Sequence, residues 1–163
     1  MELLLDRTIK IHPEDNKKNI DIPLVIGRKY HALFIRTKYE PKIVADEKFA
    51  QNRIEAGIAR YVPESARAEY GNWRDYLPLV NFVTFSLDHE DEYIGCAHRH
   101  SPVMDHIISE EYSSPGFFRH AVVPGRWNCV LNCHAVVDDE VTYSLQVFGA
   151  DENEELHDYV QAF

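Results

Sequence analysis

Alternation of apolar and polar residues in two neighbouring stretches, 127–137 and 141–148, is the strongest constraint on the fold. One side of the first stretch carries Trp127, Cys129, Leu131, Cys133, Ala135 and Val137. One side of the second carries Val141, Tyr143, Leu145 and Val147. Because successive side chains of a strand point to opposite faces, each stretch predicts a strand with one buried face. The residues between them, Asp138 to Glu140, predict a short hairpin connection.

Further stretches with strand character lie on the N-terminal side of this pair. They cover residues 7–12, 19–26, 29–39, 79–88, 93–98 and 106–109, and turn-forming residues separate most of them. Pro23 has no N–H to donate, so it places the second stretch at a sheet edge or a bulge. One apolar face per strand and short connections predict a mainly all-β fold. We expect an antiparallel two-sheet β-sandwich, similar to a jelly roll.

The apolar spacing changes from strand-like to helical between residues 46 and 70. Apolar positions recur at helical spacing from Ala50 to Tyr61, and Asp46 stands where an N-cap belongs. A short second helix is expected to end near Tyr70. This stretch therefore predicts a helical insertion, around residues 46–70, between strands of one sandwich domain that spans residues 1–163. The acidic tail, residues 149–163, predicts a weak helix that ends in Tyr159, Val160 and Phe163.

The N-terminus and the cysteines favour a cytoplasmic protein. Residues 1–7 have an acid at position 2 and only three consecutive leucines, whereas a secretory signal needs a basic start and about 7 to 15 apolar residues. No apolar run approaches the roughly 20 residues of a membrane helix, so we expect no membrane partner. Cys129 and Cys133 on one strand would lie roughly 13 Å apart, too far for a disulfide. They predict buried free thiols.

The formal net charge of −10 is concentrated in the second half of the chain. Residues 1–87 contain 14 Lys and Arg against 12 Asp and Glu, while residues 88–163 contain 3 against 15. An acidic surface repels phosphate backbones, so we expect no nucleic-acid partner. The acidic turns near residues 88–92 and 138–140 leave Ca²⁺ binding as an alternative to a simple solvated surface.

An ordered set of short motifs resembles one known kind of domain. The set comprises residues 81–88, Gly95 with residues 97–100, then residues 114–117, 124–127 and 134–137, with residues 13–23 as opening strands. In this order they resemble the β-sandwich domain that precedes the catalytic domain in some PHP-type metal-dependent hydrolases. The metal ligands and catalytic groups of that family lie in the following domain, and their motifs have no counterpart in this sequence. The resemblance therefore implies a stand-alone accessory sandwich.

Four histidines are candidate metal ligands. His98 and His100 would share one strand face about 6.6 Å apart, a spacing that can chelate one divalent ion. His106 and His134 are the candidate further ligands. The alternative is that these histidines form hydrogen bonds that hold a loop against the sandwich.

Trp73 and Tyr76 are candidate ligand-binding residues. They lie together in an expected loop, residues 71–76, where exposed aromatic rings would form a sugar-stacking platform. No G-x-S-x-G motif is present to supply an activated serine. Cys96 and His98 would share a strand face, but a buried thiol is the commoner outcome.

These observations predict a non-catalytic accessory or interaction module without a cofactor. Its expected partner is a separately encoded hydrolase, or a second copy of the chain as a homodimer. One alternative is a small metal-binding protein or metal-dependent hydrolase that uses the cluster of His98, His100 and His106. The other alternative is a carbohydrate-binding module.

Overall fold

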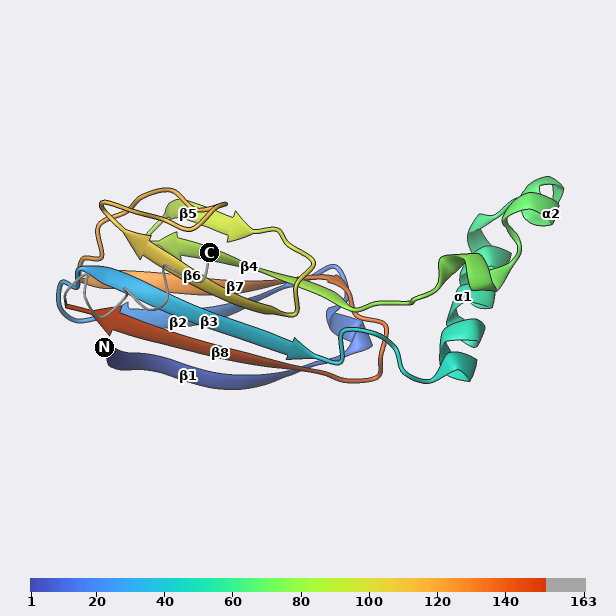
Figure 1. Ribbon diagram of the computed structural model, residues 1–163, viewed down its shortest axis with the longest axis horizontal. Helices are drawn as coiled ribbons and strands as arrows, with labels where there is room; N and C mark the ends of the chain where they lie inside the picture. The colour runs from blue at the N-terminus through green and yellow to red at the C-terminus, as the bar shows by residue number, and fades with distance from the viewer. Residues whose placement is uncertain (152–163) are drawn as a thin grey trace.

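The computed structural model describes residues 1–151, which form two antiparallel four-stranded sheets packed as a sandwich (Figure 1). Sheet A has the strand order β1-β8-β3-β6, and sheet B has the order β2-β7-β4-β5. The strands of sheet A are β1 (Glu2–Ile11), β8 (Val141–Ala150), β3 (Ala32–Glu40) and β6 (Val103–Ser109). Those of sheet B are β2 (Asn19–Ile26), β7 (Gly125–Ala135), β4 (Phe82–His89) and β5 (Glu92–Ala97). The predicted mainly-β sandwich is confirmed.

The chain changes sheets at every connection between consecutive strands except the one from β4 to β5. This strand order is that of a jelly roll, as the sequence predicts. The predicted hairpin at Asp138 to Glu140 is wrong, because β7 pairs with β2 and β4 while β8 pairs with β1 and β3. Those three residues instead cross from sheet B to sheet A.

The core lies between the two sheets and is built largely from the predicted apolar faces. The prediction is wrong at the end of β7, where Val136 enters the core while Ala135 and Val137 are only partly buried. Trp127, Leu131, Tyr143 and Leu145 are all 1% exposed or less. Cys129 and Cys133 belong to the same core and are free thiols, as predicted. Burial raises the pKa of the Cys129 thiol to about 12, so this cysteine packs as a neutral apolar side chain.

Two strands are longer than their sequence patterns indicate. The first strand begins at Glu2 and not at Arg7, and a register shift between Leu3 and Leu5 disturbs its pairing with β8. β6 begins at Val103 and not at His106. The proline in β2 lies at the edge of sheet B, as its missing N–H predicts.

The helical insertion between β3 and β4 projects from one end of the sandwich (Figure 1). It contains α1 (Glu47–Tyr61), α2 (Arg67–Tyr70) and the short 3₁₀ helices η2 (Glu64–Ala66) and η3 (Trp73–Tyr76). Another 3₁₀ turn, η1 (Pro13–Asp15), joins β1 to β2. The Asp46 side chain accepts a hydrogen bond of 3.0 Å from the Phe49 amide, so the predicted N-cap is confirmed. We call residues 46–79 the helical arm.

The predicted weak helix of the acidic tail lies outside the described residues, because the description ends at Asp151 and β8 extends to Ala150. Within residues 1–151, no helix combines the length and apolar character that a membrane crossing requires.

Candidate functional site

Three of the four candidate metal ligands gather around Phe82 on the outer side of sheet B. The ring centroid of His100 lies 4.4 Å from that of Phe82, and the two rings stack at 4°. The centroid of His134 is 4.9 Å from the same ring, and that of His98 is 5.5 Å away. The structure therefore brings the loop histidines 98 and 100 to the histidine of β7, around an aromatic ring.

The contacts of this group are those of an aromatic cluster. The Nε2 atom of His134 is hydrogen-bonded to the Thr84 hydroxyl at 2.8 Å. Partial burial, together with the nearby His98 ring, lowers the pKa of His134. The Lys42 ammonium lies 5.2 Å from the Phe82 ring centroid. The ring contacts of His98 and His100 with Phe82 place the loop after β5 against the outer side of sheet B.

His106 belongs to a different part of the molecule. It pairs with Ile35 in sheet A and points into the core between the sheets, where its ring stacks on Phe85. It is 4% exposed, and burial lowers its pKa from 6.5 to about 4. A histidine in this environment is neutral at physiological pH. His106 therefore does not join the three histidines around Phe82.

The residues described, 1–151, include no group of three or more His, Cys, Asp or Glu side chains placed to hold a metal ion. Asp105, the residue before His106, is directed to the outer face of sheet A. Its carboxylate accepts two hydrogen bonds from the Arg36 guanidinium, at 2.9 and 2.8 Å. The four histidines proposed as one ligand set are thus divided between the outer side of sheet B and the core between the sheets.

Trp73 is not the exposed loop residue that its sequence context predicts. It begins η3, is only 8% exposed and packs against Ile54 and Ile58 of α1. Tyr76, at the end of the same turn, is 43% exposed, and its hydroxyl donates a hydrogen bond to the Tyr70 carbonyl. A sugar-stacking pair formed by Trp73 and Tyr76 is therefore a wrong prediction, because Trp73 serves as the small core of the arm.

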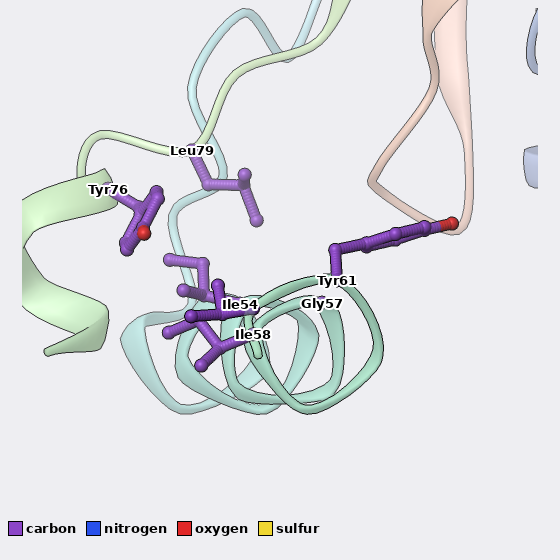
Figure 2. Close-up of a pocket in the computed structure, with 7 residues that line it drawn as sticks. Ile54, Gly57, Ile58, Tyr61, Tyr76 and Leu79 are labelled. Atoms are coloured by element: carbon purple, nitrogen blue, oxygen red, sulfur yellow. The ribbon is translucent and has the colours of Figure 1, made fainter. Parts of the chain in front are cut away.

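An apolar recess lies on the helical arm, away from the two sheets of the sandwich. It is a groove of about 330 Å³ that opens between α1 and the chain that follows η3. It is lined by Ile54, Gly57, Ile58, Tyr61, Val62, Tyr76 and Leu79. Figure 2 shows Ile54 and Ile58 directed toward Tyr76 and Leu79, with Tyr61 turned outward. We call this feature the arm groove.

Gly57 is the residue of the arm groove that the fold itself does not explain. A glycine inside a helix costs about 1 kcal/mol relative to alanine. A Cβ atom built on Gly57 would meet no atom within 4 Å, so no neighbouring side chain requires the glycine. The open space above Gly57 instead permits the close approach of another backbone.

Two arginines of α1 lie next to Gly57 around the helix. Successive residues of a helix are rotated by about 100° around its axis. Arg53 and Arg60 therefore lie beside Gly57, on the opposite side of it from Ile54 and Ile58. The Arg60 guanidinium lies 5.2 Å from the Tyr61 ring centroid, and that of Arg53 lies 5.0 Å from the Phe49 ring. The groove thus has an apolar lining, and Arg60 and the Asp139-paired Arg53 lie on the adjoining surface of α1.

Asn81 joins the base of the arm to the sandwich. Its side chain is fully buried, and its amide donates hydrogen bonds to the Pro41 carbonyl and to the Asp138 carboxylate, at 3.0 and 2.7 Å. Its side-chain oxygen accepts hydrogen bonds from the Val137 and Asp138 amides, at 2.8 and 3.2 Å. Asn81 therefore links the chain segments that enter and leave the arm to the crossover that follows β7.

Two features of the structure were not predicted from the sequence. The helical spacing of Ile54, Gly57, Ile58 and Tyr61 signals an apolar face, but not that part of this face stays open. The second feature is a pair of histidines, His89 and His120, whose Nδ1 and Nε2 atoms are 2.9 Å apart beside Trp127. Burial lowers the pKa of His120.

Comparison with models of known protein families and with curated protein sequences found no match for this chain.

Proposed function

We propose that this protein is a non-catalytic interaction module that binds an amphipathic helix of a partner protein in the arm groove. The observation that carries this proposal is the apolar groove on an arm that stands away from the sandwich (Figure 1). α1 packs against η3 and not extensively against any strand. The sandwich then serves as the scaffold that presents the arm.

The lining of the groove favours a helix as the bound element. Amphipathic helices enter apolar grooves through side chains spaced by three or four residues. Tyr61, which is 73% exposed, and Tyr76 are large rings at the surface of the groove, and aromatic residues of this kind are enriched where binding energy is concentrated. Gly57 would let the partner backbone lie close to α1.

The two arginines of α1 favour acidic residues beside the apolar face of that helix. Arg53 and Arg60 are both exposed and lie next to Gly57 around α1, and Arg53 also lies 3.8 Å from the Asp139 carboxylate. Electrostatic complementarity of this kind speeds association and selects among partners. The resemblance of the chain to an accessory sandwich makes a separately encoded hydrolase one candidate carrier of the helix.

The test uses two synthetic helical peptides that share one leucine and phenylalanine face and carry either glutamate or lysine on the flanks. We expect the glutamate peptide to shift backbone amide NMR signals of α1 and η3. The lysine peptide should bind about tenfold more weakly, because it meets Arg53 and Arg60 with like charge.

Two variants at one position provide the matched control. Gly57→Trp should fill the groove and abolish the shifts. Gly57→Ala, whose methyl group meets no neighbour in the free protein, should bind the peptide but more weakly than the unsubstituted chain, because the methyl group stands where the partner backbone would approach. Circular dichroism verifies that both variants fold. Equal binding by all three proteins, or shifts confined to the sandwich strands, would contradict the proposal.

A further inference from the structure

Two histidines meet at the end of sheet B that lies away from the helical arm (Figure 1). His89 is the last residue of β4, and His120 lies in the chain between β6 and β7. The His89 Nδ1 and His120 Nε2 atoms are 2.9 Å apart, which is a hydrogen-bond distance. The His89 ring stacks on Trp127 with centroids 4.4 Å apart, and the His120 ring lies at 81° to the same ring at 5.5 Å. The pair therefore packs against a buried ring of the core.

The geometry of this pair accommodates one proton between the two rings but not two. A hydrogen bond between imidazole nitrogens needs one nitrogen that carries a proton and one that offers a lone pair. A pair with a single positive charge meets this need, because one ring is still neutral and accepts. When both rings are charged, each of the two facing nitrogens carries a proton. The hydrogen bond is then lost, and two positive charges lie side by side.

His89 is the member of the pair that is fixed in place. Its Nε2 atom is buried and has no hydrogen-bond partner within residues 1–151. A Cβ atom built on Gly125 would lie 2.7 Å from this Nε2 atom, so the edge of the ring lies directly against the backbone of β7. Trp127 packs on the face of the same ring. Repulsion within the pair is therefore relieved by movement of His120.

Charged groups face the pair from β5, from the turn before it and from β7. A Glu92 carboxylate oxygen of β5 lies 4.0 Å from His120 Nδ1. Glu90 of the turn lies beside His89, but its carboxylate accepts hydrogen bonds from the amide and the guanidinium of Arg126, at 2.9 and 3.1 Å. Burial lowers the pKa of His120, Glu92 raises it in part, and His89 lowers it further. The first charge on the pair therefore faces Glu92, while a second would face a carboxylate that Arg126 already neutralises.

His120 belongs to a short stretch, residues 119–121, that lies between two backbone anchors. On one side, the Phe118 amide donates a hydrogen bond of 2.8 Å to the Ile94 carbonyl of β5. On the other side, the Tyr30 amide donates a hydrogen bond of 3.0 Å to the Val122 carbonyl. Within the stretch, the His120 amide donates a hydrogen bond of 3.0 Å to the last carbonyl of β6. The two anchors confine a release of His120 to residues 119–121, which we call the latch segment.

We propose that His89 and His120 form an acid-sensitive latch, which holds the latch segment beside Trp127 at neutral pH and releases it when both rings are protonated. In the released segment His120 is solvated, so it binds its proton with an ordinary pKa of about 6.5. The latched pair binds its second proton only at lower pH. Because the released state holds more protons, its population rises as the pH falls below about 6.5 and declines again as the pH is raised.

The test is hydrogen exchange of the His120 amide, measured by NMR between about pH 7.5 and about pH 5 and corrected for the intrinsic pH dependence of exchange. We expect the opening equilibrium constant of this amide to rise about tenfold for each pH unit below about 6.5, because opening takes up one further proton. Circular dichroism at each pH verifies that the sandwich remains folded. An opening constant that does not change with pH would overturn the proposal.

Two glutamine variants separate the latch from the other histidines. His120→Gln keeps an amide group that can bond to His89 Nδ1 but does not titrate, so the pH dependence at residue 120 should vanish. His12→Gln, at a histidine bonded to the Asp139 carbonyl, is the control and should leave it unchanged. The same rise in His120→Gln, or its loss in His12→Gln, would overturn the proposal.

A second measurement on the unsubstituted chain covers the case in which His120→Gln does not fold. NMR titration of the two imidazole rings should show two separate protonation steps, because the rings share one proton. A single step near pH 6.5 at both rings would show that they titrate independently, and would overturn the proposal.

Discussion

The sandwich and the helical arm bury apolar side chains on very different scales. The sandwich places the rings of Phe85, Trp127 and Tyr143 at 1% exposure or less within one continuous core. The arm has a separate cluster that consists of Ile54, Ile58 and Trp73, with Val62 and Leu79 packed against it. The sandwich therefore has one large buried core, while the arm leaves part of its apolar face open at the arm groove.

The difference also separates structural histidines from the candidate binding surface. His106 and the histidines around Phe82 contact aromatic rings of the sandwich and hold its parts together. The arm contains no histidine. If the protein acts by binding, substitutions in the sandwich should change stability first, and substitutions in the arm groove should change binding first.

The largest effect is expected in the sandwich core. Trp127→Ala should lower the free energy of unfolding by about 3–5 kcal/mol, because it removes a ring that is 1% exposed and leaves a cavity. Tyr61→Ala, at a ring that is 73% exposed on the arm, should change it by less than about 0.5 kcal/mol. Urea denaturation measures both values. Similar losses in the two variants would contradict the division between core and arm.

The pH dependence of stability should depend on His106. Its pKa is about 4 in the folded protein and 6.5 as a free side chain, so the unfolded chain binds the proton first as the pH falls. As the pH falls from 6.5 to 4, protonation of His106 in the unfolded chain should lower the free energy of unfolding by about 3 kcal/mol. His106→Phe should remove that part of the loss. Parallel pH profiles for the two proteins would show that His106 is not buried as a neutral ring.

Loss of Asn81 should loosen the base of the arm. Asn81→Ala leaves the Val137 amide without its side-chain acceptor and should cost about 1–3 kcal/mol. Amide hydrogen exchange should increase at the start of β4 and after β7. Asn72→Ala, which removes a hydrogen bond within the arm alone, is the control and should leave those strands unchanged.

The smallest expected change in stability is an increase, at Gly57 of the arm. Gly57→Ala should raise the stability of the arm by about 0.5–1 kcal/mol, because alanine favours the helix and its methyl group meets no neighbour. Hydrogen exchange of the α1 amides reports this change. A destabilising Gly57→Ala would show that the open space above α1 is absent in solution.

The sequence predicts the sandwich because several strands, above all β2 and β8, alternate apolar and polar residues. Alternation along β7 and β8 specifies which side chains enter the core, and the register between strands agrees with those faces. Asp46 likewise specifies the start of α1 through a local hydrogen bond. These features depend on residues close together in the chain, so a single sequence is enough to find them.

The sequence-based predictions that were wrong concern contacts between segments far apart in the chain. The residues between β7 and β8 suit a hairpin and a crossover equally, and only strand pairing distinguishes the two. His106 lies near His98 in sequence, but β6 joins sheet A and β5 joins sheet B. Trp73 enters a core because η3 folds back on α1. The arm groove remained unpredicted for the same reason.

Hydrogen exchange of the native chain, with and without the glutamate peptide, tests the central claim most directly. The amides of α1 should exchange through local opening at a lower free energy than those of β7, because the arm buries a smaller cluster. Addition of the peptide should slow exchange in residues 47–76 and leave the sandwich strands unchanged. Protection confined to the strands, or α1 exchange slowed to the rate of β7 before any peptide is added, would contradict the account.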